Sequence, residues 1–171
     1  FRHTQMEFGS SGIDACWHLL NKSTQSFVCL ERRESFGGTW SLFKYPGVRS
    51  DSDMFTFGYS FKPWPSEKQI APAPDILAYL ESTIQDAGLD EHIRYNHHIL
   101  SADWSSSTAK WTVKCGNGSV FECKFLFCCS GYYNQDRGHV VDFPGESGAK
   151  LAPKRRENEK KLSTVFENMT E

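Results

Sequence analysis

Residues 9–31, GSSGIDACWHLLNKSTQSFVCLE, combine two periodicities that together predict the fold. Over residues 9–22 apolar side chains recur at helical spacing, and Ser10 or Ser11 is placed to cap the helix. Residues 26–31 are instead a short apolar run with β-branched and aromatic members, which is typical of a buried parallel strand. A helix followed by such a strand predicts an α/β fold with a parallel sheet and flanking helices. The apolar helix positions are Ile13, Cys16, Trp17 and Leu20.

A second helix is predicted at residues 72–89, PAPDILAYLESTIQDAGL. Asp75 is placed to cap its start and Gly88 to end it. The segment before it, residues 34–74, is punctuated by glycine, proline and serine and is rich in aromatic side chains. It is too long for an idle connection in a compact domain, so we expect it to carry function. The apolar stripe of the second helix is Ile76, Leu77, Leu80 and Ile84.

The pattern changes to a period of two between residues 93 and 123. Short alternating runs there, the last two joined by the turn sequence GNGS, predict a small antiparallel β-meander. Residues 125–131, FLFCCSG, then form a dense apolar strand that stops at Ser-Gly. Strands of a parallel sheet stop in this way where their carboxyl ends open onto a ligand crevice.

Composition restricts the class of protein. The 171 residues are 39% hydrophobic, which suits one domain with a sizeable core. We place that domain at residues 1–145 and a charged tail, a solvated helix or disordered, at residues 146–171. A formal charge of −2 argues against nucleic acid as a partner. Since no apolar run approaches a membrane span and no secretory signal is present, we expect a cytoplasmic protein.

The six cysteines contain no C-x-x-C pair. Cys128 and Cys129 are adjacent, so on a strand their side chains point to opposite faces. We therefore expect buried, reduced thiols that act as small hydrophobic side chains rather than disulfides. The histidines are equally poor ligands, because His97 and His98 are neighbours that cannot share one strand face, and no metal site is predicted.

Gly9, Gly12 and Glu31 have the spacing of a dinucleotide-binding unit. Glycines at a helix start let a pyrophosphate reach backbone N–H groups at the positive end of the helix dipole. Glu31 lies nineteen residues beyond Gly12, close to the offset of about 20 for an acid that accepts hydrogen bonds from ribose hydroxyls. Half of such a fingerprint is also what an ordinary helix start and strand end produce, so both interpretations stay open at this point.

The first part of the fingerprint is missing. Glu7 stands where the first glycine is expected, and a carboxylate there repels a diphosphate. The residues before it, RHTQME, do not read as an apolar first strand. We therefore expect an incomplete first strand and an incomplete glycine loop.

Longer motifs carry a resemblance. The segments ERRESFGGTW, YPGVRSDSDMFTFGYSFKPWP, HIRYNHHILSADWS and FLFCCSGYYN together closely resemble the FAD-binding half of the Baeyer–Villiger type of flavin-containing monooxygenases, which includes ethionamide-activating enzymes. The resemblance runs from about residue 9 to residue 145, and the combination of GGTW with YPG-x-R-x-D is specific. It implies a Rossmann-like FAD-binding domain with a small antiparallel meander.

The resemblance also assigns roles along an extended FAD. The pyrophosphate lies at Gly9, Ser11 and Gly12, and the adenosine ribose at Glu31. Asp51, bordered by Tyr45 and Arg49, matches an acid near the flavin ring and is the one catalytic candidate; Lys44 replaces an arginine that relatives usually carry. An exposed Arg49–Asp51 ion pair, and Trp40 as an ordinary core residue, remain the plain alternatives. The other implied cofactor contacts are Gly38, Thr39 and Trp40 beside the flavin, the main chain of Ile99 at the adenine, and Ser130 and Gly131 at the closing turn.

The implied activity is a monooxygenase that uses FAD, NADPH and O2 on a small organic substrate, with the cofactor supplying the hard chemistry. Neither a second glycine fingerprint for NADPH nor the F-x-G-x-x-x-H-x-x-x-W signature occurs in the chain. We therefore expect a truncated domain whose turnover needs a missing C-terminal half. A remnant or interaction domain that no longer binds flavin is the alternative. A different FAD or NAD enzyme, such as a disulfide reductase, is disfavoured because no redox cysteine pair follows the first helix.

Overall fold

The computed structural model describes residues 3–6 and 8–133, with side chains from residue 8 onward. The chain divides into two compact units, Phe1–Gly131 and Tyr132–Glu171, and the second lies almost wholly outside the described residues. The expected domain boundary at residue 145, the charged tail and Glu7 also lie outside them. The fold and the candidate site both belong to the first unit.

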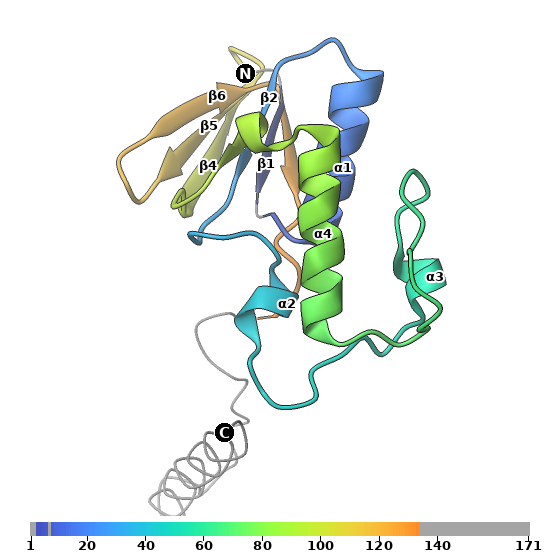
Figure 1. The fold of residues 1–171 in the computed structure, drawn as a ribbon. Coiled ribbons are helices and arrows are strands. Elements are labelled where there is room, and N and C mark those ends of the chain that lie inside the picture. The colour runs from blue at the N-terminus through green and yellow to red at the C-terminus, as the bar shows by residue number, and fades with distance from the viewer. Residues whose placement is uncertain (1–2, 7, 134–171) are drawn as a thin grey trace, which may run out of the picture. The chain divides into compact units, whose positions relative to one another are not determined.

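A four-stranded parallel sheet forms the centre of this unit (Figure 1). Its strands are β1 (His3–Met6), β2 (Phe27–Leu30), β3 (Ile93–Arg94) and β7 (Phe125–Cys128). Their order is β3-β2-β1-β7, and every neighbouring pair is parallel. This parallel strand order is the one expected of a Rossmann-like unit.

Strand β1 corrects the expectation that the first strand is incomplete. It pairs along all four of its residues with β2 on one side and with β7 on the other. A strand with partners on both sides satisfies its backbone hydrogen bonds regardless of how apolar its sequence is, so its polar composition was a poor guide.

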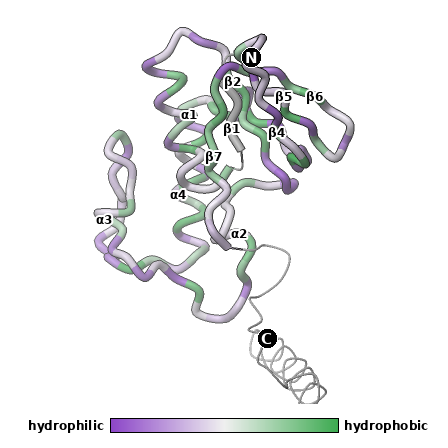
Figure 2. Tube along the Cα trace, turned by 180° about the vertical axis from the view of Figure 1, so that it is seen from behind, coloured by the Kyte–Doolittle hydropathy of each residue, from purple (hydrophilic) through white to green (hydrophobic). Residues whose placement is uncertain are grey.

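Helices α1 (Ser10–Lys22) and α4 (Ala73–Ala87) cover one face of the parallel sheet, and a second sheet covers the other (Figure 1). The second sheet is an antiparallel meander of β4 (Ile99–Ser105), β5 (Lys110–Cys115) and β6 (Val120–Cys123), in that order. The predicted meander is confirmed. Hydrophilic and hydrophobic segments alternate along both helices, as amphipathic helices require (Figure 2).

Strand β2 joins the two apolar cores, because its alternate side chains face opposite layers. Phe27 and Cys29 pack in the core beneath the helices, and Val28 and Leu30 pack in the core beneath the meander. All four are buried, as the continuous apolar run predicted. The parallel sheet is therefore covered on both faces by the chain itself at this strand.

Strand β7 contradicts the expectation of buried thiols, because its last residue, Cys128, is exposed. It is the last strand in the sheet order, and Phe125, Phe127 and Cys128 are exposed, whereas Leu126 packs against the meander core. Cys16, Cys29, Cys115 and Cys123 are buried as predicted, and none of the six cysteines, all of which are described, is in a disulfide. The difference arises because an edge position leaves one face of a strand with less cover.

The helix ends were only partly predicted. Gly9, rather than a serine, is the N-cap residue of α1, and Pro72, rather than Asp75, is that of α4. Asp75 instead lies in the first turn, where its charge is favourable to the helix dipole. Gly88 ends α4 in a left-handed conformation, as expected. In the predicted apolar stripe of α1, Ile13 and Cys16 are buried, but Leu20 is 38% exposed.

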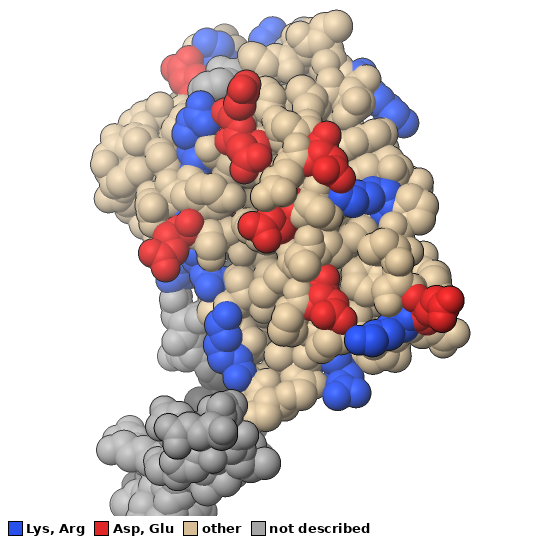
Figure 3. Space-filling view, in the orientation of Figure 1, with Lys and Arg blue, Asp and Glu red and all other residues tan. Residues whose placement is uncertain are grey.

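Short elements complete the unit: helices α2 (Thr39–Leu42) and α3 (Met54–Phe57) and the 3-10 helix η1 (Asp90–His92). No helix in the described residues has both the length and the apolar character needed to cross a membrane. On the face drawn in Figure 3, acidic and basic side chains are interspersed rather than gathered by sign.

Candidate cofactor site

The candidate site lies at the carboxyl edge of the parallel sheet. Met6, Leu30 and Cys128 are aligned across β1, β2 and β7, so the three segments that come after these strands leave from the same edge. In parallel sheets this edge is where ligands bind. The alignment places the glycine loop, Glu31 and the turn at Ser130 and Gly131 along one side of the sheet.

The start of α1 has no side-chain cap among the described residues. Its N-cap residue, Gly9, is extended (φ −84°, ψ −167°), and the first turn contains no acid. The first intrahelical bond runs from the Ile13 N–H to the Gly9 carbonyl at 3.1 Å. The N–H groups at the start of a helix lack intrahelical acceptors, so this end offers donors and the positive dipole end to an anion.

Glu31 connects the tip of β2 to the glycine loop. Its side chain is buried, with 4% exposure, and its Oε2 accepts a hydrogen bond from the Phe8 N–H at 2.6 Å. Its Oε1 accepts one from the Arg33 N–H at 2.8 Å. An ionised carboxylate has about four acceptor positions, so two remain for the hydroxyls of a ribose. Two backbone N–H groups therefore hold the carboxylate of Glu31 in place and leave acceptor positions available for a ligand.

The double glycine lies against the same loop. The Gly37 N–H donates to the Phe8 carbonyl at 3.2 Å, and a Cβ on Gly38 would lie 3.3 Å from the Cα of Gly9. Gly37 has a φ of +107°, and a Cβ there would meet the Leu77 side chain at 2.6 Å. The left-handed backbone at Gly37 favours glycine, and the close approach of Gly38 to Gly9 brings the GGTW segment to the start of α1.

Trp40 lies at the margin of the helix-side core. It is half-buried and meets Phe57 edge-on, with ring centroids 6.0 Å apart. The core and cofactor interpretations of this residue are thus compatible, because the indole packs against the core and still presents surface. Its proximity to a flavin stays a prediction, as does that of Thr39, the first residue of α2.

The segment that contains Asp51 is fixed by its backbone. Ser50 and Ala71 exchange bonds, from Ser50 N–H to the Ala71 carbonyl at 2.9 Å and from Ala71 N–H to Ser50 Oγ at 3.1 Å. Asp51 itself is exposed, and Arg49 Nε bonds to the Gly47 carbonyl at 3.2 Å. The Arg49–Asp51 ion pair does not form between these two described residues. Asp51 as the catalytic candidate stays a prediction.

Asp53, two residues after Asp51, caps a helix. It is the N-cap residue of α3, and its Oδ1 accepts from the Thr56 N–H at 2.8 Å. Hydrogen bonds from Thr56 lower the pKa of this carboxyl below its ordinary value. An acid just before the apolar Met54 is a recognisable capping signal in the sequence, although it was not among the predicted helix starts.

An aromatic anchor, which we define as Trp17, Tyr59, Phe61, Trp64 and Tyr79, attaches the far end of this long segment to α1 and α4. Phe61 stacks on Trp17 at 3.9 Å and on Tyr59 at 5.0 Å between ring centroids. Tyr59 and Trp64 both contact the Tyr79 ring. The Tyr59 hydroxyl donates to the Ser10 carbonyl at 2.7 Å, so the anchor reaches the first residue of α1. Burial raises the pKa of Tyr59 far above its usual value, so the hydroxyl remains a donor.

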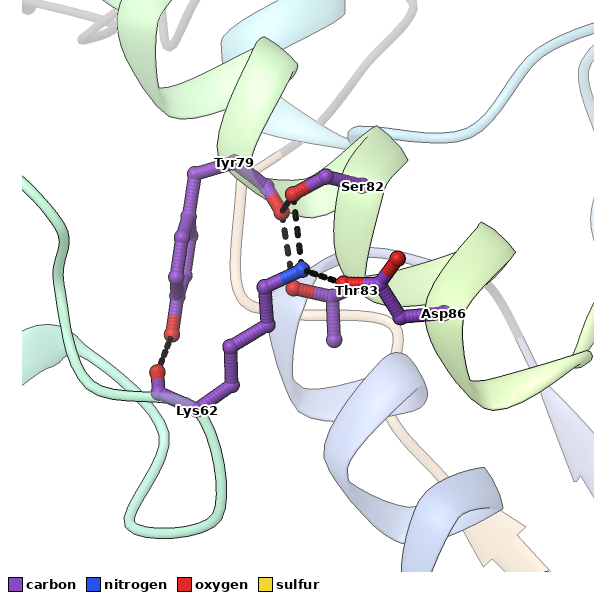
Figure 4. Close-up of polar contacts among 5 residues, drawn as sticks. All are labelled: Lys62, Tyr79, Ser82, Thr83 and Asp86. Carbon is purple, nitrogen blue, oxygen red and sulfur yellow. Dashed lines mark hydrogen bonds and ion pairs between the residues drawn. The ribbon is translucent and has the colours of Figure 1, made fainter.

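Polar bonds reinforce the anchor on α4 (Figure 4). The Tyr79 hydroxyl accepts from the Tyr59 N–H at 2.8 Å and donates to the Lys62 carbonyl. Lys62 Nζ lies 2.6 Å from Asp86 Oδ2 and 2.8 Å from Ser82 Oγ. Tyr59 and Lys62 lie in the quoted segment at residues 45–65, but their bonds to α4 were not predicted, because the partners are spread over residues 59–86.

The remaining cofactor candidates are Ile99, Ser130 and Gly131. Among the described residues, no side-chain contact connects them to the other candidate residues. Ile99 opens β4, where it pairs with Cys115 and packs against the meander core. Ser130 is exposed, and Gly131 has a φ of +70°. Their roles at the adenine and at the closing turn stay predictions. No group of histidine, cysteine or acidic side chains suited to a metal ion occurs in the part of the chain that the structure describes.

Comparison with known proteins gives the site a context. No protein-family model matches the chain. It is 52% identical over 141 residues to the FAD-containing monooxygenase EthA of Mycolicibacterium smegmatis, covering 80% of this chain and 29% of that protein. It is 44% identical over 147 residues to the probable FAD-binding monooxygenase AlmA of an Acinetobacter species, covering 83% and 30%.

Solved structures agree with these relatives. The cyclohexanone monooxygenase of Rhodococcus sp. Phi1 bound to NADP+ matches with a TM-score of 0.75 and 26% identity, over 85% of this chain and 28% of that one. An oxidised steroid monooxygenase bound to NADP matches with a TM-score of 0.74 and 26% identity, over 86% and 28%.

The chain is thus similar to part of the FAD-containing monooxygenases, and its structural neighbours are monooxygenases of the Baeyer–Villiger type. It spans about three-tenths of the length of the curated relatives that it matches. The Rossmann-like fold expected from the motifs is confirmed, and the uncapped start of α1, the acid at Glu31 and the bare backbone at Gly37 and Gly38 suit the diphosphate, ribose and elongated shape of FAD.

Proposed function

We propose that this chain binds FAD along the carboxyl edge of its parallel sheet. The observation that carries the proposal is the hydrogen bond of 2.6 Å between Glu31 Oε2 and the Phe8 N–H. It brings the acid of β2 to the loop that opens α1, the two elements that must be adjacent if one molecule is to touch both. Two elements far apart would have removed the basis for a dinucleotide site.

In this proposal each group has a physical task. The N–H groups of Ser10, Ser11 and Gly12, with the dipole of α1, hold the pyrophosphate. The remaining acceptor positions of Glu31 hold the ribose hydroxyls, and the negative charge disfavours a 2′-phosphate. Gly38, Thr39 and Trp40 extend beside the flavin end, where an indole can exclude water. Ile99, Ser130 and Gly131 complete the adenine and closing contacts, and Asp51 lies toward the flavin.

For the whole protein we propose an NADPH-dependent monooxygenase of the Baeyer–Villiger or heteroatom-oxidising type. Such a reaction consumes NADPH, a proton, O2 and an organic substrate, and it yields NADP+, water and the oxygenated product. The redox chemistry is what bound FAD supplies in these enzymes; the residues described here bind it and exclude water. This part of the proposal rests on relatives of which the chain spans about three-tenths.

The proposal extends to partners and place. In this proposal, a C-terminal half that is not part of this sequence supplies the NADPH site and most of the substrate pocket. Small organic molecules and O2 are the reactants, and nucleic acid is not a partner. A cytoplasmic location is proposed on the absence of a basic field and of an apolar span in the sequence.

Gel filtration after incubation with FAD tests the proposal. The eluted protein is expected to be yellow, with flavin absorbance, yet to oxidise NADPH at a negligible rate. Riboflavin is the matched control ligand, because it lacks the pyrophosphate and the adenosine that the chain is proposed to hold. Retention of neither flavin by correctly folded protein would overturn FAD binding.

The alternative is a remnant that folds but no longer binds flavin. Its basis is Glu7 at the first glycine position, which lies outside the described residues. Glu7→Gly separates the two cases: restoration of flavin binding in this variant alone would show that the loop is damaged and the rest of the site is intact. Absence of binding in both proteins would favour the remnant.

A further inference from the structure

The Arg33 side chain links the adenosine side of the site to the flavin side. We propose that Arg33 is a positioning residue for FAD, and that its guanidinium holds the Gly37–Gly38 turn at the distance from α1 that the cofactor requires. This inference rests on the proposed FAD binding. Arg33 acts through the turn rather than through a contact with the ligand.

The backbone of Arg33 belongs to the adenosine side. Its N–H donates to Glu31 Oε1 at 2.8 Å, and its carbonyl accepts from the Asn96 N–H at 3.0 Å. The first bond orients the acid, and the second fixes the segment after β3. Because both use the backbone of Arg33, they persist when its side chain is replaced.

The side chain reaches across to the flavin side. Nη1 lies 2.8 Å from Ser41 Oγ and 3.3 Å from the Gly38 carbonyl oxygen, and Nη2 lies 3.5 Å from the Ser41 carbonyl oxygen. Ser41 is buried, and its own hydroxyl also donates to the Gly38 carbonyl at 3.2 Å. A planar guanidinium presents several donors in a fixed geometry, which the single ammonium of lysine does not.

The Gly38 carbonyl is the point where this matters. Gly38 has a φ of +51°, and a Cβ added to Gly38 would lie 3.3 Å from the Cα of Gly9. The same carbonyl accepts from the N–H groups of Ser41 and Leu42, which belong to α2. A fixed Gly38 carbonyl oxygen therefore sets how closely the turn approaches Gly9. It also sets the direction of the chain at Thr39 and Trp40, which follow the turn.

Preorganisation gives the expected consequence. Binding of a ligand that spans both sides includes the cost of ordering any segment that is loose, whereas binding of a ligand confined to one side does not. Loss of the guanidinium loosens residues 37–41 but leaves the backbone bonds at Glu31. FAD should then lose affinity while ADP, which ends before the flavin, should not.

The experiment titrates the full 171-residue chain and its variants with FAD and with ADP. Arg33→Gln is expected to weaken FAD binding by about tenfold and ADP binding by less than about threefold. Arg33→Lys should recover part of the FAD affinity, since it keeps the charge and one contact. Arg94→Gln is the matched control, because Arg94 also bonds through Nη1 to two backbone carbonyls, those of Glu91 and Ile93, and should alter neither affinity.

The outcomes separate the two proposals. If the unaltered chain binds neither FAD nor ADP, the proposed function fails. If it binds both, and Arg33→Gln lowers both affinities equally or neither, Arg33 has no positioning role and the proposed function stands. Should Arg33→Gln fail to fold, Ser41→Ala removes one end of the same link, and a selective loss of FAD affinity is again expected; an unchanged ratio of FAD to ADP affinity would overturn the inference.

Discussion

The carboxyl edge of the parallel sheet and the aromatic anchor hold the same long segment in different ways. At the edge, bare glycine backbone and hydrogen bonds at Glu31, Gly37 and Gly38 maintain close approach with little side-chain bulk. At the anchor, stacked rings on α1 and α4 bury apolar surface. We infer that the edge relies on close backbone approach, which suits the proposed ligand path, and that the anchor contributes stability through buried aromatic surface.

The largest effect is expected at the sheet edge, at Gly37, where the turn packs against the Leu77 side chain of α4. Gly37→Ala places a methyl group 2.6 Å from the Leu77 side chain in a left-handed conformation and should lower the free energy of unfolding by about 2–4 kcal/mol. Chemical denaturation measures it. Gly118→Ala is the control, because Gly118 also has a positive φ, +86°, but nothing within 4 Å of an added Cβ. Equal losses for the two variants would mean that crowding at Gly37 is unimportant.

A smaller loss is expected within the anchor from Tyr79→Phe. This change removes a hydroxyl that accepts from the Tyr59 N–H and donates to the Lys62 carbonyl, and it leaves the ring in place. We expect about 1–3 kcal/mol less stability, with FAD affinity unchanged in the protein that remains folded. Thermal unfolding and a FAD titration check the two parts. A variant that kept its stability but lost FAD would reverse the assignment of roles to the two regions.

Lys62→Met should lower the free energy of unfolding by less than Tyr79→Phe does. The ammonium bonds to Asp86, which is well exposed, and to Ser82, so solvent screening reduces the contribution to roughly 1 kcal/mol or less. The loss should shrink at high salt, because salt screens exposed charge pairs. Denaturation at low and high ionic strength measures this, and a loss independent of salt would argue that the aliphatic stem, not the charge, matters.

The smallest effect is expected at Asp53, and it depends on pH. The pKa of this carboxyl is lowered in the folded protein, so its stabilisation is present above the unfolded pKa and is lost as pH falls through the folded pKa. Asp53→Asn keeps a capping side chain but removes the charge. Its melting temperature should therefore be slightly below that of the unaltered chain at about pH 7, with the difference closing at about pH 3. A difference of the same size at both pH values would exclude the charge as its cause.

The sequence predicted the elements whose patterns are local. The apolar run at residues 26–31, the turn at residues 116–119 and Gly88 at the end of α4 all specify their structure within a few residues. The position of Glu31 at the end of β2 was also predictable, because its offset from Gly12 reflects the length of one helix and one strand, whereas its role at a ribose stays a prediction. Such features need no knowledge of distant partners.

Features set by distant partners were missed. Strand β1 is polar in sequence and forms through pairing with β2 and β7, which no pattern in residues 3–6 shows. The exposure of β7 results from its edge position in the sheet order. Tyr59 bonds to a carbonyl 49 residues away, and Arg33 reaches a turn that its own position does not indicate. In each case the partner is specified by topology.

The decisive experiment on FAD binding at the sheet edge is a titration of FAD into the full chain and into Glu31→Gln. Glu34→Gln, an exposed residue of the same segment, is the matched control. We predict tight binding by the unaltered chain and by Glu34→Gln, and at least about tenfold weaker binding by Glu31→Gln, which loses the charge that accepts from the Phe8 N–H and from the ribose. Equal FAD affinity in all three folded proteins would contradict the role of Glu31 and with it the proposed site.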